Sequence, residues 1–99
     1  MLRNQSNEVQ GSMTEKIEKY STVLRDQDGI TYEVAAFGGT MPDGLWEGWL
    51  EFSPSESELP VLRTDRETTQ PNRKALEYWA TGLEPLYFEG AFARAHTKH

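Results

Sequence analysis

The stretch V-L-R-T-D-R-E-T-T-Q-P-N-R-K-A-L-E-Y-W, from Val61 to Trp79, decides the fold of this 99-residue chain. It begins with β-forming residues, passes through a polar segment and enters an amphipathic helical pattern at Pro71. Before this stretch, apolar and polar residues alternate with the period of a strand. After it, apolar residues recur at helical spacing. The sequence therefore predicts a sheet followed by helices.

Alternating hydrophobicity and turn residues predict three or four antiparallel strands in the first two thirds of the chain. In the third of them, Trp46, Gly48, Leu50 and Phe52 fall on one face, which is expected to face the core. Connections of hairpin length make the pairing antiparallel. In order, the predicted segments are a strand within Lys16–Arg25, a turn at 26–29, a strand at Ile30–Phe37, a glycine-rich connection at 38–44, a strand at Leu45–Phe52 and a short strand at Val61–Thr64.

Two helices are predicted after the sheet. Pro71 suits the first position of a helix because the N–H that it lacks has no partner there, and Thr69 or Gln70 is expected to cap this helix. The last apolar segment admits a helix or a strand, and its alanine content together with Pro85 favours the helix. The predicted helices are 71–81 and 85–96, both packed on one face of the sheet.

The chain is predicted to form a single α+β domain over residues 15–97, preceded by a disordered tail at 1–14. Strands followed by helices are typical of this class. In the predicted core, helix residues meet strand residues: Leu76, Trp79, Phe88 and Phe92 with Tyr32, Val34, Trp46, Leu50 and Phe52.

The formal net charge of −6 is unevenly distributed. Residues 1–59 hold four bases against eleven acids, a balance of −7, and residues 60–99 hold six bases against five acids, a balance of +1. Nucleic-acid binders carry a basic excess because phosphate contacts dominate their affinity. The charge therefore argues against general nucleic-acid binding and leaves room for a local anion site.

Several functional classes lack their sequence signature. The chain has no cysteine, which excludes disulfides and thiolate metal sites. It shows no apolar signal-peptide core and no run of about 18 apolar residues, so no membrane contact is expected and the predicted location is cytoplasmic. Nucleophile-elbow, zinc-protease, Walker and dinucleotide motifs do not occur. No cofactor, metal or catalytic residue is predicted, and an enzyme is the less favoured class.

The polar part of the 61–79 stretch is the first candidate site. A helix N-terminus offers unpaired N–H groups and a partial positive charge, and guanidinium groups bind phosphates or carboxylates bidentately. Alternatively, Arg66 and Arg73 pair with Asp65, Glu67 or Glu77, and the segment is structural. The predicted anion- or nucleotide-binding residues are Arg63, Arg66, Thr68, Thr69 and Arg73.

Phe37 and Trp49 form the second candidate, an interaction surface. Both fall on the sheet face opposite the predicted core, with Trp49 between Glu47 and Glu51. Two helices cover only one face of such a sheet, so an exposed aromatic pair there indicates a partner surface. If the helices lie on this face instead, both residues belong to the core.

Carboxylates give a third candidate. Glu33, Glu47 and Glu51 share a face of the predicted sheet, where their oxygens could bind a divalent cation. Such a trio is more often the solvated side of an antiparallel sheet. His96 and His99 lie at the C-terminal end, where the helix is expected to fray.

These observations predict a small non-enzymatic interaction module that binds a protein partner or self-associates as a homodimer through an exposed sheet face. The alternative is a small anion- or nucleotide-binding regulatory protein that uses the Arg/Thr-rich segment before the first helix.

Overall fold

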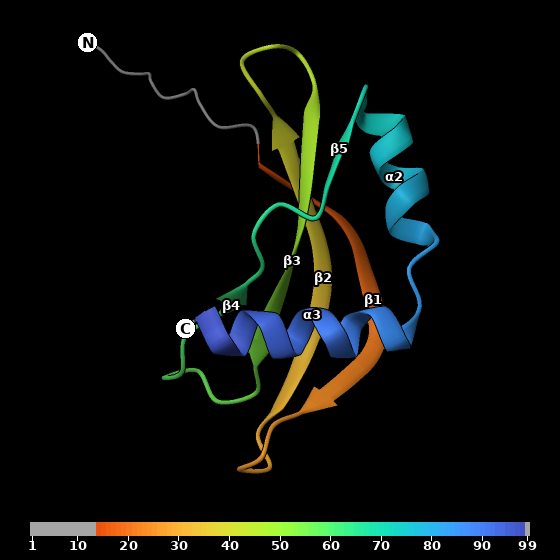
Figure 1. Cartoon of the computed structure of the whole chain (residues 1–99). Coiled ribbons are helices and arrows are strands. Elements are labelled where there is room, and N and C mark those ends of the chain that lie inside the picture. Colours follow the sequence, from red (N-terminus) through yellow and green to blue (C-terminus); the bar gives the residue numbers. More distant parts are fainter. Residues whose placement is uncertain (1–13, 99) are drawn as a thin grey trace, which may run out of the picture.

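The computed structural model describes residues 14–98 and contains an antiparallel sheet and two helices (Figure 1). The predicted α+β fold, a meander followed by two C-terminal helices, is confirmed. Apart from Thr14, the predicted tail at 1–14 lies outside the described residues. In chain order the elements are β1 (Glu15–Arg25), β2 (Thr31–Thr40), β3 (Trp46–Pro54), β4 (Leu62–Arg63), β5 (Thr68–Gln70), α2 (Arg73–Thr81) and α3 (Pro85–Lys98).

The sheet has the order β1-β2-β3-β4, with β5 also paired to β3. β2 and β3 form its regular centre, in continuous antiparallel register from Tyr32 opposite Pro54 to Thr40 opposite Trp46. The edge strand β1 pairs less regularly, because its register with β2 shifts after Lys16 and again after Lys19. Bulges of this kind twist an edge strand and interrupt its pairing.

The connection after the second strand was predicted to begin too early. Gly38 and Gly39 lie within β2 and are buried, and Gly38 pairs directly with Gly48 of β3. The turn itself spans residues 41–45 and is closed by the Met41 amide, which donates to the Leu45 carbonyl over 2.7 Å. Gly44 takes φ +89° there, a conformation that favours glycine.

The fifth strand was not predicted, because its sequence, T-T-Q, reads as a polar loop. It continues the edge that β4 begins, after a break opposite the middle of β3. At the break the buried Thr64 restores the ladder: its amide donates to the Leu50 carbonyl and its hydroxyl accepts from the Leu50 amide, each over 3.0 Å. A side-chain hydroxyl thus replaces a missing backbone acceptor.

The first helix begins later than predicted and has a different cap. Neither Thr69 nor Gln70 caps it, because both belong to β5. The N-cap is Asn72, whose backbone is extended and whose Oδ1 accepts from the Ala75 amide over 2.8 Å. The ambiguous last segment is helical: α3 buries Phe88, Ala91, Phe92 and Ala95 at the predicted spacing.

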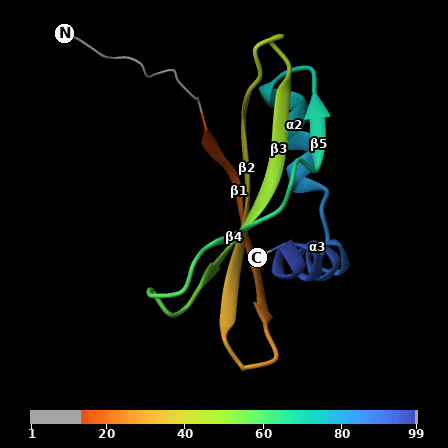
Figure 2. The ribbon, with the colours of Figure 1, turned by 60° about the vertical axis from the view of Figure 1, so that its left-hand side comes forward.

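Both helices lie on the same side of the sheet (Figure 2). Neither helix in residues 14–98 is long and apolar enough to cross a membrane. Between helices and sheet lies a buried cluster that includes most of the predicted core, although Trp46 and Trp79 are only half-buried. The buried members of the cluster are Leu24, Tyr32, Val34, Ala36, Leu50, Phe52, Leu62, Ala80, Phe88, Ala91, Phe92 and Ala95.

Leu76 of α2 sits on the Gly38–Gly48 pair. A Cβ added to Gly48 would lie 2.7 Å from Leu76 Cδ1, and a Cβ added to Gly38 would collide with Leu76 Cδ2. In both cases the added Cβ would come closer to Leu76 than van der Waals contact allows. The two glycines therefore open the space in the sheet surface that the fully buried Leu76 fills.

Tyr20 of β1 fastens both helices to the sheet. Its hydroxyl donates to the Ala80 carbonyl at the end of α2 over 2.7 Å, and its ring packs against Phe88 of α3 at a centroid distance of 4.4 Å. Burial, more than the nearby Glu18, raises the pKa of this phenol. The phenol is thus held in its protonated, donating form.

We expect Gly48→Ala to lower the free energy of unfolding by about 1–3 kcal/mol, because the new methyl group overpacks a filled site. Leu76→Ala alone should also destabilise, by about 2–5 kcal/mol, because it leaves a cavity. The double variant should lose less stability than the sum of the two single losses, because the smaller side chain at position 76 leaves room for the methyl group added at position 48. Urea denaturation of the four proteins measures this coupling.

Gly90→Ala is the matched control. In α3 an added Cβ meets nothing closer than Arg94 Nη1 at 3.8 Å, so alanine should stabilise by about 0.5–1 kcal/mol through helix propensity. Strictly additive losses for Gly48→Ala and Leu76→Ala would show that Leu76 does not fill the glycine site.

Candidate functional site

The sheet face turned away from the helices, called here the outer face, carries the first candidate surface. No helix in residues 14–98 lies over it (Figure 2). Strand alternation places aromatic residues near its centre and charged residues around them. Its members are Lys16, Lys19 and Val23 of β1, Glu33, Ala35 and Phe37 of β2, Glu47, Trp49 and Glu51 of β3, and Arg63 of β4.

Phe37 and Trp49 are direct cross-strand partners at the centre of the outer face. A basic side chain covers each ring. The Arg63 guanidinium lies 3.9 Å from the Trp49 ring centroid, and Lys16 Nζ lies 5.8 Å from that of Phe37. Cations over ring faces are attracted by the ring quadrupole. The pair is therefore an aromatic centre with cationic covers.

Trp49 is only 3% exposed although no helix of the described residues 14–98 covers it. Arg63 shields its face, and its Nε1 donates to Glu51 Oε2 over 2.9 Å, which satisfies the indole N–H. From the sequence, Trp49 was expected to be either exposed or covered by the helices. In the structure an arginine covers it instead. Phe37 is half-buried and is the more accessible of the two. The interaction surface at Phe37 and Trp49 stays a prediction.

The outer-face carboxylates each have a basic or donor partner. Glu33 lies 3.8 Å from Lys19 Nζ, Glu47 lies 3.9 Å from Arg66 Nε, and Glu51 accepts from Trp49. Among residues 14–98, no group of three or more histidines and carboxylates is arranged to hold a metal ion. Two members of the trio, Glu33 and Glu47, thus lie in ion pairs, and the third, Glu51, accepts from an indole N–H.

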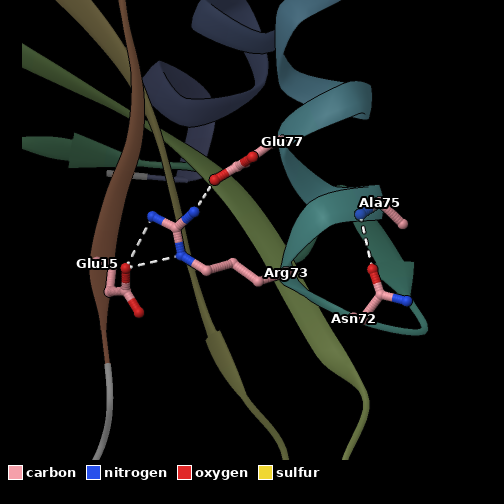
Figure 3. Close-up of polar contacts among 5 residues, drawn as sticks. All are labelled: Glu15, Asn72, Arg73, Ala75 and Glu77. Carbon is pink, nitrogen blue, oxygen red and sulfur yellow. Dashed lines mark hydrogen bonds and ion pairs between the residues drawn. The ribbon is translucent and has the colours of Figure 1, made fainter.

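Arg73, at the start of α2, ties that helix to the first strand (Figure 3). Its Nε donates to Glu15 Oε1 of β1 over 2.9 Å, and its Nη1 pairs with Glu77 one turn along the helix. The Arg73–Glu77 pair was the structural alternative predicted from their spacing. Figure 3 shows the guanidinium held between the two carboxylates, beside the Asn72 cap.

The polar segment from Arg63 to Arg73, called here the junction, has its middle residues on both faces of the sheet. Thr68 lies on the helix side, where its methyl group would be 3.1 Å from a Cβ on Gly48, and its hydroxyl accepts from Gln70 Nε2. On the other side Arg66 donates to the Thr69 hydroxyl over 3.3 Å. Neighbouring residues of a strand point to opposite faces, so the two threonines cannot line one site.

Acidic residues of the junction hold α3. Glu67 Oε1 accepts from the Tyr87 hydroxyl and, over 2.7 Å, from Arg94 Nη2, while Asp65 pairs with Lys98 Nζ over 2.7 Å. Burial and then the bond to Glu67 raise the pKa of Tyr87 to about 12. The bond to Lys98 lowers the pKa of Asp65. The segment thus fixes the position of the last helix.

The five predicted anion-binding residues therefore do not converge on one site, and only Arg66 and Thr69 share their surroundings. Arg63 lies over Trp49, Arg66 and Thr69 lie beside Glu47, and Arg73 lies between two carboxylates. An anion at Arg66 or Arg73 would compete with a neighbouring acid. Anion or nucleotide binding at this segment stays a prediction and gains no support from the geometry.

A groove of about 520 Å³ lies between the β1–β2 turn and the end of α3. Asp26 Oδ1 accepts from the Asp28 and Ile30 amides, each over 2.9 Å, and its Oδ2 lies 3.9 Å from His96 Nε2. This groove was not predicted, because its two sides lie about 70 residues apart along the chain and come together only on folding. Asp26 organises its own turn, as an aspartate does in an Asx-turn.

No protein-family model matches the chain, and no curated protein or solved structure shows significant similarity to it.

We expect Glu67→Gln to lower the pKa of Tyr87 from about 12 toward its ordinary value of 10, because the amide removes the anion that favours the protonated phenol. A raised pKa stabilises the fold fully below pH 10, and that stabilisation is lost as the pH rises from 10 to about 12. NMR titration of the Tyr87 ring measures the shift. Glu89→Gln on the same helix is the control and should leave the Tyr87 titration unchanged. An unchanged Tyr87 titration in Glu67→Gln would contradict the hydrogen bond between Glu67 and Tyr87.

Proposed function

We propose that the chain is a non-enzymatic interaction module of the cytoplasm that binds a protein through its outer face, in the first instance a second copy of itself. The observation that supports this most is the position of both helices on one side of the sheet. The other side keeps an aromatic pair that no helix in residues 14–98 covers (Figure 2).

The composition of the outer face supports a protein partner. Protein interfaces combine an aromatic or apolar centre with a polar rim, and arginine and aromatic residues are enriched in them. Here Phe37, Trp49 and Ala35 form the centre, and ion pairs such as Lys19–Glu33 lie around it. Val23, 60% exposed, extends the apolar surface along β1.

The outer face is basic on its edge strands and acidic on its two central strands. Lys16 and Lys19 lie on β1, acidic residues lie on β2 and β3, and Arg63 lies on β4. Two copies that face each other with an offset of one strand bring the basic residues of an edge strand opposite acidic residues of the other sheet. Such complementarity directs the register of an interface more than it adds affinity.

The test compares the mass of the wild type and of Phe37→Asp by size-exclusion chromatography with light scattering over a concentration series. Phe37 is preferred to Trp49, because removing the buried Trp49 would itself destabilise the fold by about 3 kcal/mol. We expect a dimer that dissociates on dilution in the wild type and a monomer in Phe37→Asp. An unpaired charge at the centre of an interface costs several kcal/mol.

Tyr78→Ser is the matched control, because Tyr78 is an exposed aromatic residue on the helical side. It should associate like the wild type, and circular dichroism should show the same fold for all three proteins. A wild type that is monomeric at every concentration, or a Phe37→Asp variant that still dimerises, would contradict self-association through the outer face.

A further inference from the structure

The side of the helical layer that faces away from the sheet carries the two most exposed large apolar side chains of residues 14–98. Tyr78 of α2 is 84% exposed and Leu86 of α3 is 79% exposed. They stand on either side of the turn between the helices, which also holds the half-buried Leu83. Scattered exposed apolar residues are ordinary, but a group of them at one turn indicates a contact surface.

Helix periodicity explains why these side chains point outward. Leu76 and Ala80 are the buried residues of α2, and Tyr78, midway between them in the sequence, falls on the opposite side of the helix. In α3 the buried stripe begins at Phe88, and Leu86 lies opposite it by the same rule. Neither residue contributes to the core, so the folding of the domain does not account for them.

A groove of about 410 Å³ adjoins the turn and is lined by Gly82, Leu83, Glu84, Leu86 and Tyr87. The Tyr87 hydroxyl is held by Glu67, so one wall of the groove is fixed to the sheet. An apolar groove with a fixed wall can receive an apolar side chain of a partner, since little ordering is then lost on binding.

Acids outnumber bases in the chain around this turn. Residues 74–94 contain three acids, Glu77, Glu84 and Glu89, and two bases at the ends of the range, Lys74 and Arg94. Glu77 is engaged by Arg73 and Arg94 by Glu67, while Glu84 lines the groove and Glu89 lies exposed on the next turn of α3. A second copy would bring the same acids against each other, and anionic lipid would be repelled. A cationic partner is attracted.

We propose that this surface, formed by Tyr78, Leu83, Glu84, Leu86 and Tyr87 and called here the elbow, binds a basic amphipathic segment of another protein. An apolar residue of the segment enters the groove beside Leu86, and its lysines or arginines face Glu84 and Glu89. The elbow lies on the helical side and the outer face on the other, so the two surfaces can be occupied together. The inference does not depend on self-association.

The test uses a fluorescent helical peptide of leucine and lysine arranged as an amphipathic helix, with the wild-type chain as titrant and fluorescence anisotropy as the readout. Helices bind grooves through apolar residues on one face. We expect binding that weakens with added salt. Leu86→Ser should weaken it at least about tenfold, and Glu84→Gln combined with Glu89→Gln should weaken it and reduce the salt dependence.

Two controls keep elbow binding separate from other binding. Phe37→Asp on the outer face should bind the peptide like the wild type, and a peptide with glutamate in place of lysine should not bind. Circular dichroism of each variant confirms its fold. Absence of peptide binding, equal binding of the glutamate peptide, or equal affinity in Leu86→Ser would overturn the proposal. So would loss of self-association in Leu86→Ser, which would assign the elbow to a second copy.

Discussion

The structure depends on the contact between Leu76 of α2 and the paired glycines, Gly38 and Gly48, at the centre of the sheet. Because neither glycine carries a side chain, the helix can approach the sheet closely enough to bury Leu76 completely. That approach brings Ala80 within reach of the Tyr20 hydroxyl and sends α3 across the same face, where Phe88 meets the Tyr20 ring. The helical layer is thereby committed to one side of the sheet.

The same commitment leaves the outer face without a helical layer from the part of the chain that the structure describes. Its aromatic centre is then covered by Arg63 and Lys16. Their charged groups lie over the aromatic rings and remain at the protein surface. This cover explains how a domain of this size keeps Trp49 out of water on an uncovered face. It also gives the face an arginine–aromatic composition common in interfaces, which is the basis of the function proposed for it.

Periodicity predicted much of this fold because it reports directly on burial. The alternation in β3 identified Leu50 and Phe52, and helical spacing identified Leu76, Phe88 and Phe92. What it missed depends on tertiary contacts. Gly38 and Gly39 read as a loop because glycine favours loops, and the packing role of Gly38 appears only once Leu76 lies over it. The junction read as a possible anion site because its partners Glu15, Tyr87, Arg94 and Lys98 lie far away in the sequence.

Leu76 occupies the space above Gly38 and Gly48. A methyl-labelled sample allows nuclear Overhauser effects to be measured from the Leu76 methyl groups. We expect strong cross-peaks to the α-protons of both Gly38 and Gly48, since the Leu76 methyl carbons would meet any Cβ placed on either residue. Leu76 methyl groups that show cross-peaks to helical neighbours alone, with none to either glycine, would contradict this placement of Leu76.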